Sequence, residues 1–165
     1  MQGRPFGVGG PAESASMRIV RPTQGTAPPE GGLVDRIFVY GSLRTGQSAR
    51  GLVEPFVREW EPATVRGELF AFPSGYPGVV LGGNRGLVMG ELLWLRDLHA
   101  CLPILDEYEG ADYRRELAEI QHVGGPTWAW IYVLEDPRVA ALGTPVPGGE
   151  WVARSTSDEL GQPAM

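Results

Sequence analysis

The sequence predicts an α+β fold, a small, mixed but mainly antiparallel β-barrel with one or two short helices. Five short segments have the composition or the alternation of strands, and another has apolar residues at helical spacing. Stretches rich in Gly and Pro separate these segments. Five or six strands accompanied by so little helix favour a barrel.

The length of 165 residues predicts a single domain. Residues 1–32 are rich in Gly and Pro and lack a periodic apolar pattern, so we expect a disordered N-terminal tail. Within it, Met17 could be an alternative start or the beginning of a brief strand, and both interpretations stay open. Residues 153–165 are polar and predict a flexible C-terminal tail, which leaves residues 33–152 as the folded domain.

Charge and hydropathy argue against two classes of partner. The net charge of −6 disfavours a nucleic-acid partner, which needs clustered Lys and Arg. No apolar run reaches the roughly 18 residues that a membrane span needs, and the N-terminus lacks the apolar region of a signal peptide. We therefore expect a cytoplasmic protein that contacts neither nucleic acid nor membrane.

Cysteine and histidine, the side chains of thiolate and imidazole metal sites, are scarce. Cys101 is the only cysteine, which excludes a disulfide framework, and its apolar neighbours predict a small core residue. His99 and His122 are too few and too far apart in sequence to indicate a pair of metal ligands. We expect no metal and no cofactor.

The first predicted strand is the apolar run at residues 36–40, which Gly41 and Ser42 end in a sharp turn. Residues 49–56 then predict a short helix that ends near Pro55.

The middle of the chain predicts two strands, at residues 64–72 and 86–95, both rich in β-branched, aromatic and leucine side chains. The stretch between them, residues 73–83, contains Tyr76-Pro77-Gly78 and predicts turns.

A helix is predicted to begin after Asp97, whose side chain can cap it. Its apolar residues recur at helical spacing: Leu98, Cys101, Leu102 and Leu105. Pro103 would kink or shorten this helix.

Two last strands are predicted at residues 113–121 and 127–134, joined by a turn at Gly124-Gly125-Pro126. In the second strand Trp128, Trp130 and Tyr132 alternate with smaller apolar residues, with the period of two that a strand imposes.

The turn after the first strand is the first candidate site. We call Tyr40, Gly41, Ser42 and Leu43 the YGSL loop. A chain that leaves a strand through glycine can gather several backbone N–H groups into a concavity that binds a carboxylate or an oxyanion. A side chain at Gly41 would block close approach, and the Ser42 hydroxyl adds a donor.

The second candidate is Glu109, which precedes Gly110 at the end of the predicted helix. Its side chain could turn inward there while Asp106 and Glu107 stay on the helix surface. Aromatic neighbours such as Tyr108 would then raise its pKa toward neutrality, as a carboxylate acting as acid or base requires. Arg114 or Arg115 could meet a substrate carboxylate, or one of them could pair with Asp106 or Glu107.

Taken together, these motifs resemble the gamma-glutamylcyclotransferase family. The matching segments are, in chain order, Phe38-Val39-Tyr40-Gly41-Ser42-Leu43, Val65-Arg66-Gly67-Glu68-Leu69-Phe70, Tyr76-Pro77-Gly78, Gly90-Glu91-Leu92, Leu105-Asp106-Glu107-Tyr108-Glu109-Gly110, Tyr113-Arg114-Arg115 and Ala129-Trp130-Ile131-Tyr132-Val133. They span nearly the whole predicted domain, whereas residues 1–32 have no family counterpart.

The resemblance implies an enzyme that cyclises a gamma-glutamyl amide to 5-oxoproline and releases an amine or amino acid. It implies that Glu109 is the general acid/base and that the YGSL loop binds the glutamyl group. Tyr113 and Tyr132 are the further substrate-binding candidates, although the spacing from Glu109 to Tyr113 is short for the family. The implied partner is a small gamma-glutamyl substrate, and the oligomeric state stays open.

This acyl-transfer chemistry agrees with the absence of an obvious metal site, because the substrate's own α-amine is the nucleophile. Holding that amine near the γ-carbonyl supplies much of the rate, since effective molarities of roughly 10⁵–10⁸ M are known for intramolecular reactions. Two alternatives remain: a non-catalytic small-ligand binding or interaction module on the same fold, and an enzyme that tailors a gamma-glutamyl-protected natural product.

Overall fold

The computed structural model describes residues 34–82 and 86–153. The tails expected at residues 1–32 and 153–165, and the brief strand considered at Met17, lie outside the described residues, apart from residue 153. The predicted domain boundaries therefore stay predictions. None of the described helices has the length and apolar character needed to cross a membrane.

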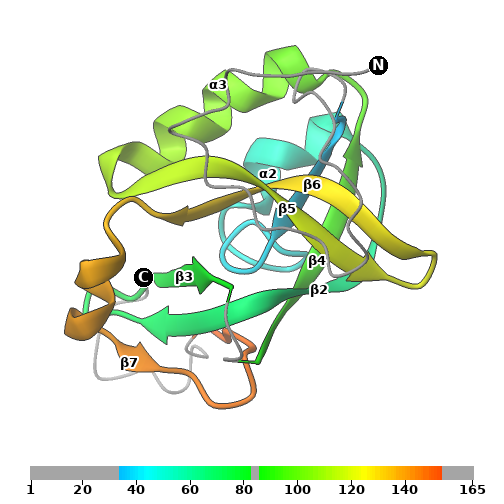
Figure 1. Cartoon of the computed structure of the whole chain (residues 1–165). Coiled ribbons are helices and arrows are strands. Elements are labelled where there is room, and N and C mark those ends of the chain that lie inside the picture. The colour runs from blue at the N-terminus through cyan, green and yellow to red at the C-terminus, as the bar shows by residue number, and fades with distance from the viewer. Residues whose placement is uncertain (1–33, 83–85, 154–165) are drawn as a thin grey trace, which may run out of the picture.

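Five strands of the described chain close into a barrel (Figure 1). They are β1 (Arg36–Val39), β2 (Val57–Ala71), β4 (Leu87–Leu95), β5 (Tyr113–His122) and β6 (Gly125–Leu134). Their order is β2-β4-β1-β6-β5, and a pairing of β5 with β2 closes the ring. β1 and β6 run parallel, with Ile37 opposite Trp130, whereas the other barrel pairs are antiparallel. The predicted mixed, mainly antiparallel barrel is confirmed.

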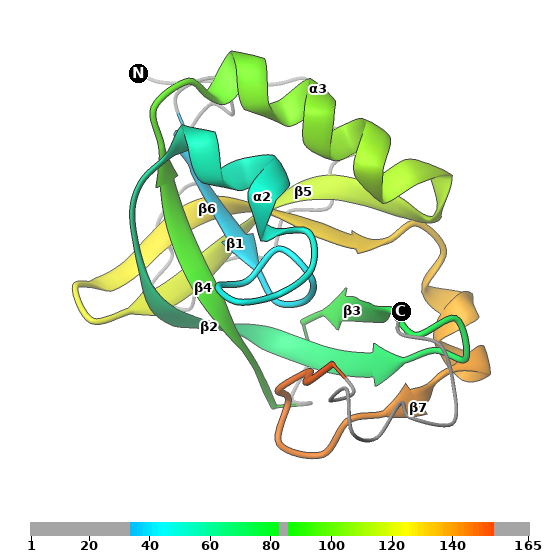
Figure 2. The same ribbon diagram turned by 180° about the vertical axis from the view of Figure 1, so that it is seen from behind.

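Two short strands flank the far end of β2. β3 (Pro77–Leu81) pairs with residues 67–71 of β2, and β7 (Thr144–Pro145) pairs with Phe70 and Ala71. A 3₁₀ helix, η5 (Pro137–Leu142), leads from β6 toward β7. Figure 2 shows the end of β2, with β3 and β7, on the side of the molecule away from helix α3 (Leu98–Glu109).

The prediction of turns over residues 73–83 is confirmed at residues 73–75 but wrong at residues 77–81, which form β3. Pro77 is the first residue of the strand, a position where its missing N–H is tolerated. Gly78 is required for packing, since a Cβ there would lie 2.8 Å from Cγ of Leu134. The motif Tyr76-Pro77-Gly78 therefore starts a strand.

Two strand boundaries also differ from the prediction. β2 begins at Val57, well before the expected start at residue 64, and its first half includes Pro62. At Pro62, β2 pairs with β4 on one side only, because its pairing with β5 begins at Ala63. Proline therefore occupies an edge position, where its missing N–H is tolerated. The β5–β6 turn lies at residues 123–124, and Gly125 already belongs to β6.

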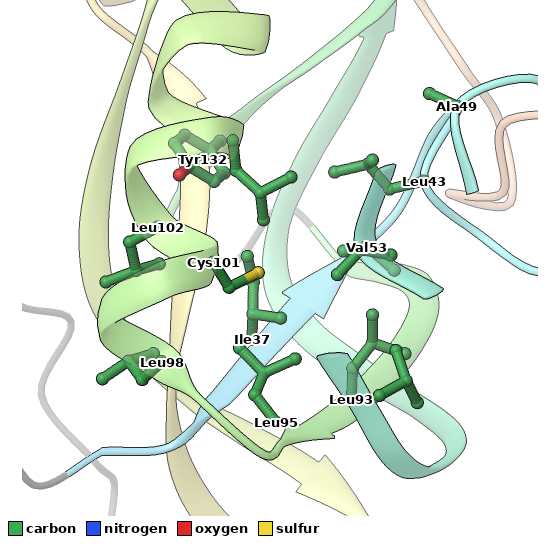
Figure 3. Packing of buried hydrophobic residues seen from close by; sticks show 13 residues of the cluster. Ile37, Leu43, Ala49, Val53, Leu93, Leu95, Leu98, Cys101, Leu102 and Tyr132 are labelled. Carbon is green, nitrogen blue, oxygen red and sulfur yellow. The ribbon is translucent and has the colours of Figure 1, made fainter. Parts of the chain in front are cut away.

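The alternation along β1 divides the core in two. Phe38 belongs to a cluster that receives residues from all five barrel strands and fills the barrel interior. Its other members include Val65, Leu92, Ile120 and Ile131. Ile37 and Val39 point to the opposite face, where they join the cluster under α3. Figure 3 shows this second cluster, with Cys101 on the face of α3 that is turned toward Ile37.

Helix α3 forms as predicted. The Asp97 side chain accepts a hydrogen bond of 3.1 Å from the backbone N–H of Ala100 and so caps the first turn. The predicted apolar face is buried: Leu98, Cys101, Leu102 and Leu105. Full burial of each leucine stabilises the fold by about 1.5–3 kcal/mol. Pro103 lies inside the helix without shortening it.

The segment between β1 and β2 contains helix α2 (Arg50–Val53) followed by a 3₁₀ turn, η3 (Glu54–Phe56). This agrees with the short helix predicted for residues 49–56. Val53 is fully buried beneath α3, so α2 holds the end of the YGSL loop against the core.

Candidate functional site

A cavity of about 420 Å³ opens where the YGSL loop meets the end of α3. All residues that the sequence singled out for the site line it: Tyr40, Gly41, Ser42, Leu43, Glu109, Tyr113 and Tyr132. The structure therefore brings together two segments that are far apart in the chain. The roles of these residues stay predictions, whereas their common location is a structural fact.

The YGSL loop forms one wall. Among the described residues, the backbone N–H groups of Gly41, Ser42 and Leu43 have no hydrogen-bond acceptor. A buried or half-buried N–H group without a partner is unfavourable unless a ligand or water satisfies it. Gly41 packs against the cavity wall, since a Cβ there would lie 2.8 Å from Cγ of Pro77. The loop thus presents main-chain donors at a place where a side chain would not fit.

A buried ionic network holds this loop in place. The carboxylate of Glu91, on β4, accepts hydrogen bonds from the backbone N–H of Thr45 at 3.0 Å and from its hydroxyl at 3.1 Å. The same carboxylate accepts a hydrogen bond of 2.9 Å from Nη1 of Arg50. This nitrogen also donates to the carbonyl of Leu43 at 3.3 Å. The loop is therefore tied to a central barrel strand through a charge pair shielded from water.

Glu109 is the last residue of α3. The next residue, Gly110, has φ of +75°, a conformation that favours glycine, and the chain turns there into the 3₁₀ helix η4 (Gly110–Asp112). Within the described part of the chain, the Glu109 carboxylate has neither a hydrogen bond nor an ion pair. Burial, and secondarily the nearby charge of Asp106, raises the pKa of Glu109 to about 7. The group can accept and release a proton near neutral pH.

Asp106 has a different environment. Arg115 donates to both of its carboxylate oxygens, at 3.0 and 2.9 Å, and the hydroxyl of Tyr132 donates to Oδ1 at 2.6 Å. The Arg115 hydrogen bonds hold the pKa of Asp106 below its usual value. The open choice between Arg114 and Arg115 is resolved: Arg115 pairs with Asp106, and Arg114 pairs with Glu116 and Glu135.

Three of the tyrosine hydroxyls around the cavity donate their protons to the protein. Tyr40 donates to the carbonyl of Tyr132 at 2.7 Å, and Tyr113 donates to the carbonyl of Pro77 at 2.6 Å. Tyr132 donates to Asp106, as described above. Burial raises the pKa of each phenol, so these groups stay neutral and offer only lone pairs to a ligand.

The remaining candidates from the sequence lie elsewhere. Cys101 is fully buried in the cluster under α3, and burial raises the pKa of its thiol to about 11. His122, in β5, contacts Glu61, in β2, at 2.9 Å, and neither it nor His99 lines the cavity. In residues 34–82 and 86–153, no three His, Cys, Asp or Glu side chains converge as metal ligands would.

The comparison with known proteins agrees with this geometry. A family model described as "Gamma-glutamyl cyclotransferase, AIG2-like" matches residues 37–153, which include each described residue that lines the cavity. The chain belongs to the gamma-glutamyl cyclotransferase, AIG2-like family. The resemblance recognised from the sequence motifs is confirmed.

Two relatives of this chain are themselves named as gamma-glutamyl cyclotransferases or members of that family. The gamma-glutamylcyclotransferase family protein ytfP of Citrobacter rodentium is 35% identical over 121 residues, which cover 72% of this chain and 96% of the relative. The gamma-L-glutamyl-butirosin B gamma-glutamyl cyclotransferase of Niallia circulans is 30% identical over 105 residues. That match covers 59% of this chain and 65% of the relative.

Among solved structures, YkqA from Bacillus subtilis matches with a TM-score of 0.58 and 25% identity. The match covers 71% of this chain but only 39% of YkqA, so this gamma-glutamyl cyclotransferase, AIG2-like chain corresponds to part of the longer protein.

Several residues line the cavity without being among the site residues predicted from the sequence: Phe38, Val39, Ser74, Tyr76, Pro77, Tyr108 and Asp112. Tyr76 and Pro77 belong to a motif that the sequence did flag as part of the family resemblance. Asp112 follows Glu109 by three residues, and the 3₁₀ turn of η4 brings both carboxylates to one opening.

Proposed function

We propose that this protein is a gamma-glutamylcyclotransferase-type enzyme, which converts a gamma-glutamyl amide to 5-oxoproline and releases the amine. The observation that carries the proposal is the unpaired Glu109 carboxylate, with its pKa near 7, lining the same cavity as the YGSL loop. A binding protein gains nothing from an unpaired, largely buried carboxylate, whereas an acid/base catalyst needs one.

In the proposed reaction the α-amine of the glutamyl group attacks the γ-carbonyl carbon. One C–N bond forms to close the five-membered ring, and the amide C–N bond to the leaving amine breaks. The α-ammonium gives up two protons in total and the departing amine gains two, so no other reactant is required. Glu109 accepts a proton from the ammonium and returns it to the leaving nitrogen.

The YGSL loop binds the negatively charged groups of the substrate and of the transition state in this proposal. The N–H groups of Gly41, Ser42 and Leu43 are free to donate to the carboxylate or the developing oxyanion of the glutamyl group. Tyr113 and Tyr132, fixed by their own hydrogen bonds, form rigid walls that position the glutamyl chain for ring closure.

The test is a panel of gamma-glutamyl amides assayed for 5-oxoproline with wild type, Glu109→Gln and Glu107→Gln. Glu107 is an exposed neighbour on the same helix that does not line the cavity. We expect Glu109→Gln to lose roughly 100-fold or more in rate with an unchanged circular dichroism spectrum, and Glu107→Gln to retain activity. Equal rates for Glu109→Gln and wild type would remove Glu109 from the mechanism, and 5-oxoproline from no substrate would contradict the proposed enzyme.

A further inference from the structure

The charged side chains that line the cavity are all acidic in the described part of the chain. Among the described residues that line it, the ionisable acids and bases other than tyrosine are Glu109 and Asp112, and neither Lys, Arg nor His is present. Asp112 is one of the exposed lining residues, with Ser74, Tyr76 and Tyr108, whereas Tyr40 and Tyr132 are buried. The opening through which a leaving group would extend therefore carries negative charge.

The neighbouring arginines do not change this balance. Arg115 is held by both oxygens of Asp106 and lies 4.8 Å from the ring centre of Trp130. Arg44 pairs with Glu150 and donates to the carbonyl of Trp151. Each guanidinium is thus committed to protein partners, and neither lines the cavity.

The hydrogen-bonding groups of the cavity support the same conclusion as its charges. The main-chain donors of the YGSL loop provide one place for an anion, and the glutamyl group brings its own carboxylate to fill it. The hydroxyls of Tyr40, Tyr113 and Tyr132 have already donated their protons, so they act as acceptors. Beyond the glutamyl group, the charged side chain that the described wall offers a leaving group is Asp112, and no described lining residue supplies a countercharge to a second carboxylate.

We infer that the site selects gamma-glutamyl amides whose leaving group is a cationic amine, and disfavours leaving groups that carry a carboxylate, with Asp112 as the specificity-determining residue. This inference rests on the proposed cyclisation. Asp112 is held by the backbone, because its carbonyl accepts a hydrogen bond of 2.8 Å from the N–H of Glu135. Its carboxylate is exposed, so it acts through a screened charge and the expected selectivity is moderate.

The experiment uses three gamma-glutamyl amides of equal length, made from 1,3-diaminopropane, butylamine and 4-aminobutanoate. These leaving groups end in an ammonium, a methyl and a carboxylate group. We expect kcat/KM for 5-oxoproline formation to follow that order in low salt, with about tenfold between the first and the last. The ratio should fall several-fold in 0.5 M salt, which screens exposed charges.

Variants assign the effect. Asp112→Asn should reduce the ammonium-to-carboxylate ratio of kcat/KM by about threefold or more, whereas Glu107→Gln removes a nearby charge outside the cavity and should leave that ratio unchanged. Equal rates for the three amides, a preference for the carboxylate, or an unchanged ratio in Asp112→Asn would overturn the inference while leaving the cyclisation intact. Failure of all three amides to give 5-oxoproline would overturn the proposed function, and this inference with it.

Discussion

The hydroxyl oxygens of Ser42 and Tyr108 lie 2.6 Å apart and join the YGSL loop to the last turn of α3. Tyr108 immediately precedes Glu109, so this contact fixes the distance between the loop donors and the acid. The two halves of the site are therefore linked directly as well as through the barrel.

Removing this contact should weaken substrate binding more than chemistry. We expect Tyr108→Phe and Ser42→Ala each to raise KM for a gamma-glutamyl amide about three- to tenfold, because one hydrogen bond contributes about 1 kcal/mol. In a double-mutant cycle the double variant should be little worse than the poorer single variant. Additive losses would show that the two hydroxyls act independently.

A methyl group at Gly41 should disturb the site without unfolding the protein. Its Cβ would press on the Pro77 ring and move the loop from the cavity wall. We expect Gly41→Ala to lose at least tenfold in kcat/KM, since small displacements of positioning groups cost rate steeply.

Gly51→Ala is the matched control, because a Cβ at Gly51 in α2 meets no atom within 4 Å. Alanine there should leave activity unchanged and keep or slightly raise stability. Comparable losses in the two variants would contradict the steric explanation.

The buried pair of Glu91 and Arg50 should be important for stability. Glu91→Gln removes the charge that Arg50 and Thr45 contact, and we expect the free energy of unfolding in urea to fall by about 2–4 kcal/mol. Glu150→Gln breaks the ion pair between Arg44 and Glu150, in which about half of the Glu150 side chain is exposed to solvent. This change should alter the free energy of unfolding by less than about 1 kcal/mol. Equal effects would mean that burial of the first pair has no energetic consequence.

The raised pKa of Glu109 makes stability depend on pH in a predictable direction. A carboxyl whose pKa is higher in the folded than in the unfolded state binds more protons when folded, so the wild type loses stability as pH rises from about 4.5 to about 7. Glu109→Gln lacks this cost. We expect it to be more stable than wild type at pH 8, by on the order of 1–3 kcal/mol, and equally stable at pH 4. A pH-independent difference would contradict the burial of an ionised Glu109.

The elements that the sequence predicts well are those with a local physical cause. Asp97 and the spacing of Leu98, Cys101, Leu102 and Leu105 define α3 without reference to the rest of the chain. β6 is equally clear from its alternation. The first half of β2 was missed because residues 58–62 are mostly exposed and end in proline, and their strand geometry comes from pairing with β4.

The candidate site was predictable for a different reason. Nothing in periodicity brings Glu109 to the YGSL loop, and only the succession of family motifs indicated that they meet. Asp112 was not predicted, because its position depends on the turn at Gly110 and on the main-chain contact with Glu135. The residues that decide the leaving group are thus set by tertiary structure that no short motif encodes.

The parallel pairing of β1 with β6 has a consequence for biosynthesis. The first strand of the barrel completes its hydrogen bonding only with the last, more than 90 positions later, as Ile37 opposite Trp130 shows. Such a long-range contact makes closure slow, because a large loop must be ordered first. While the chain emerges from the ribosome, β1 has an unpaired edge, and the enzyme's pocket cannot exist until translation of the domain is almost finished.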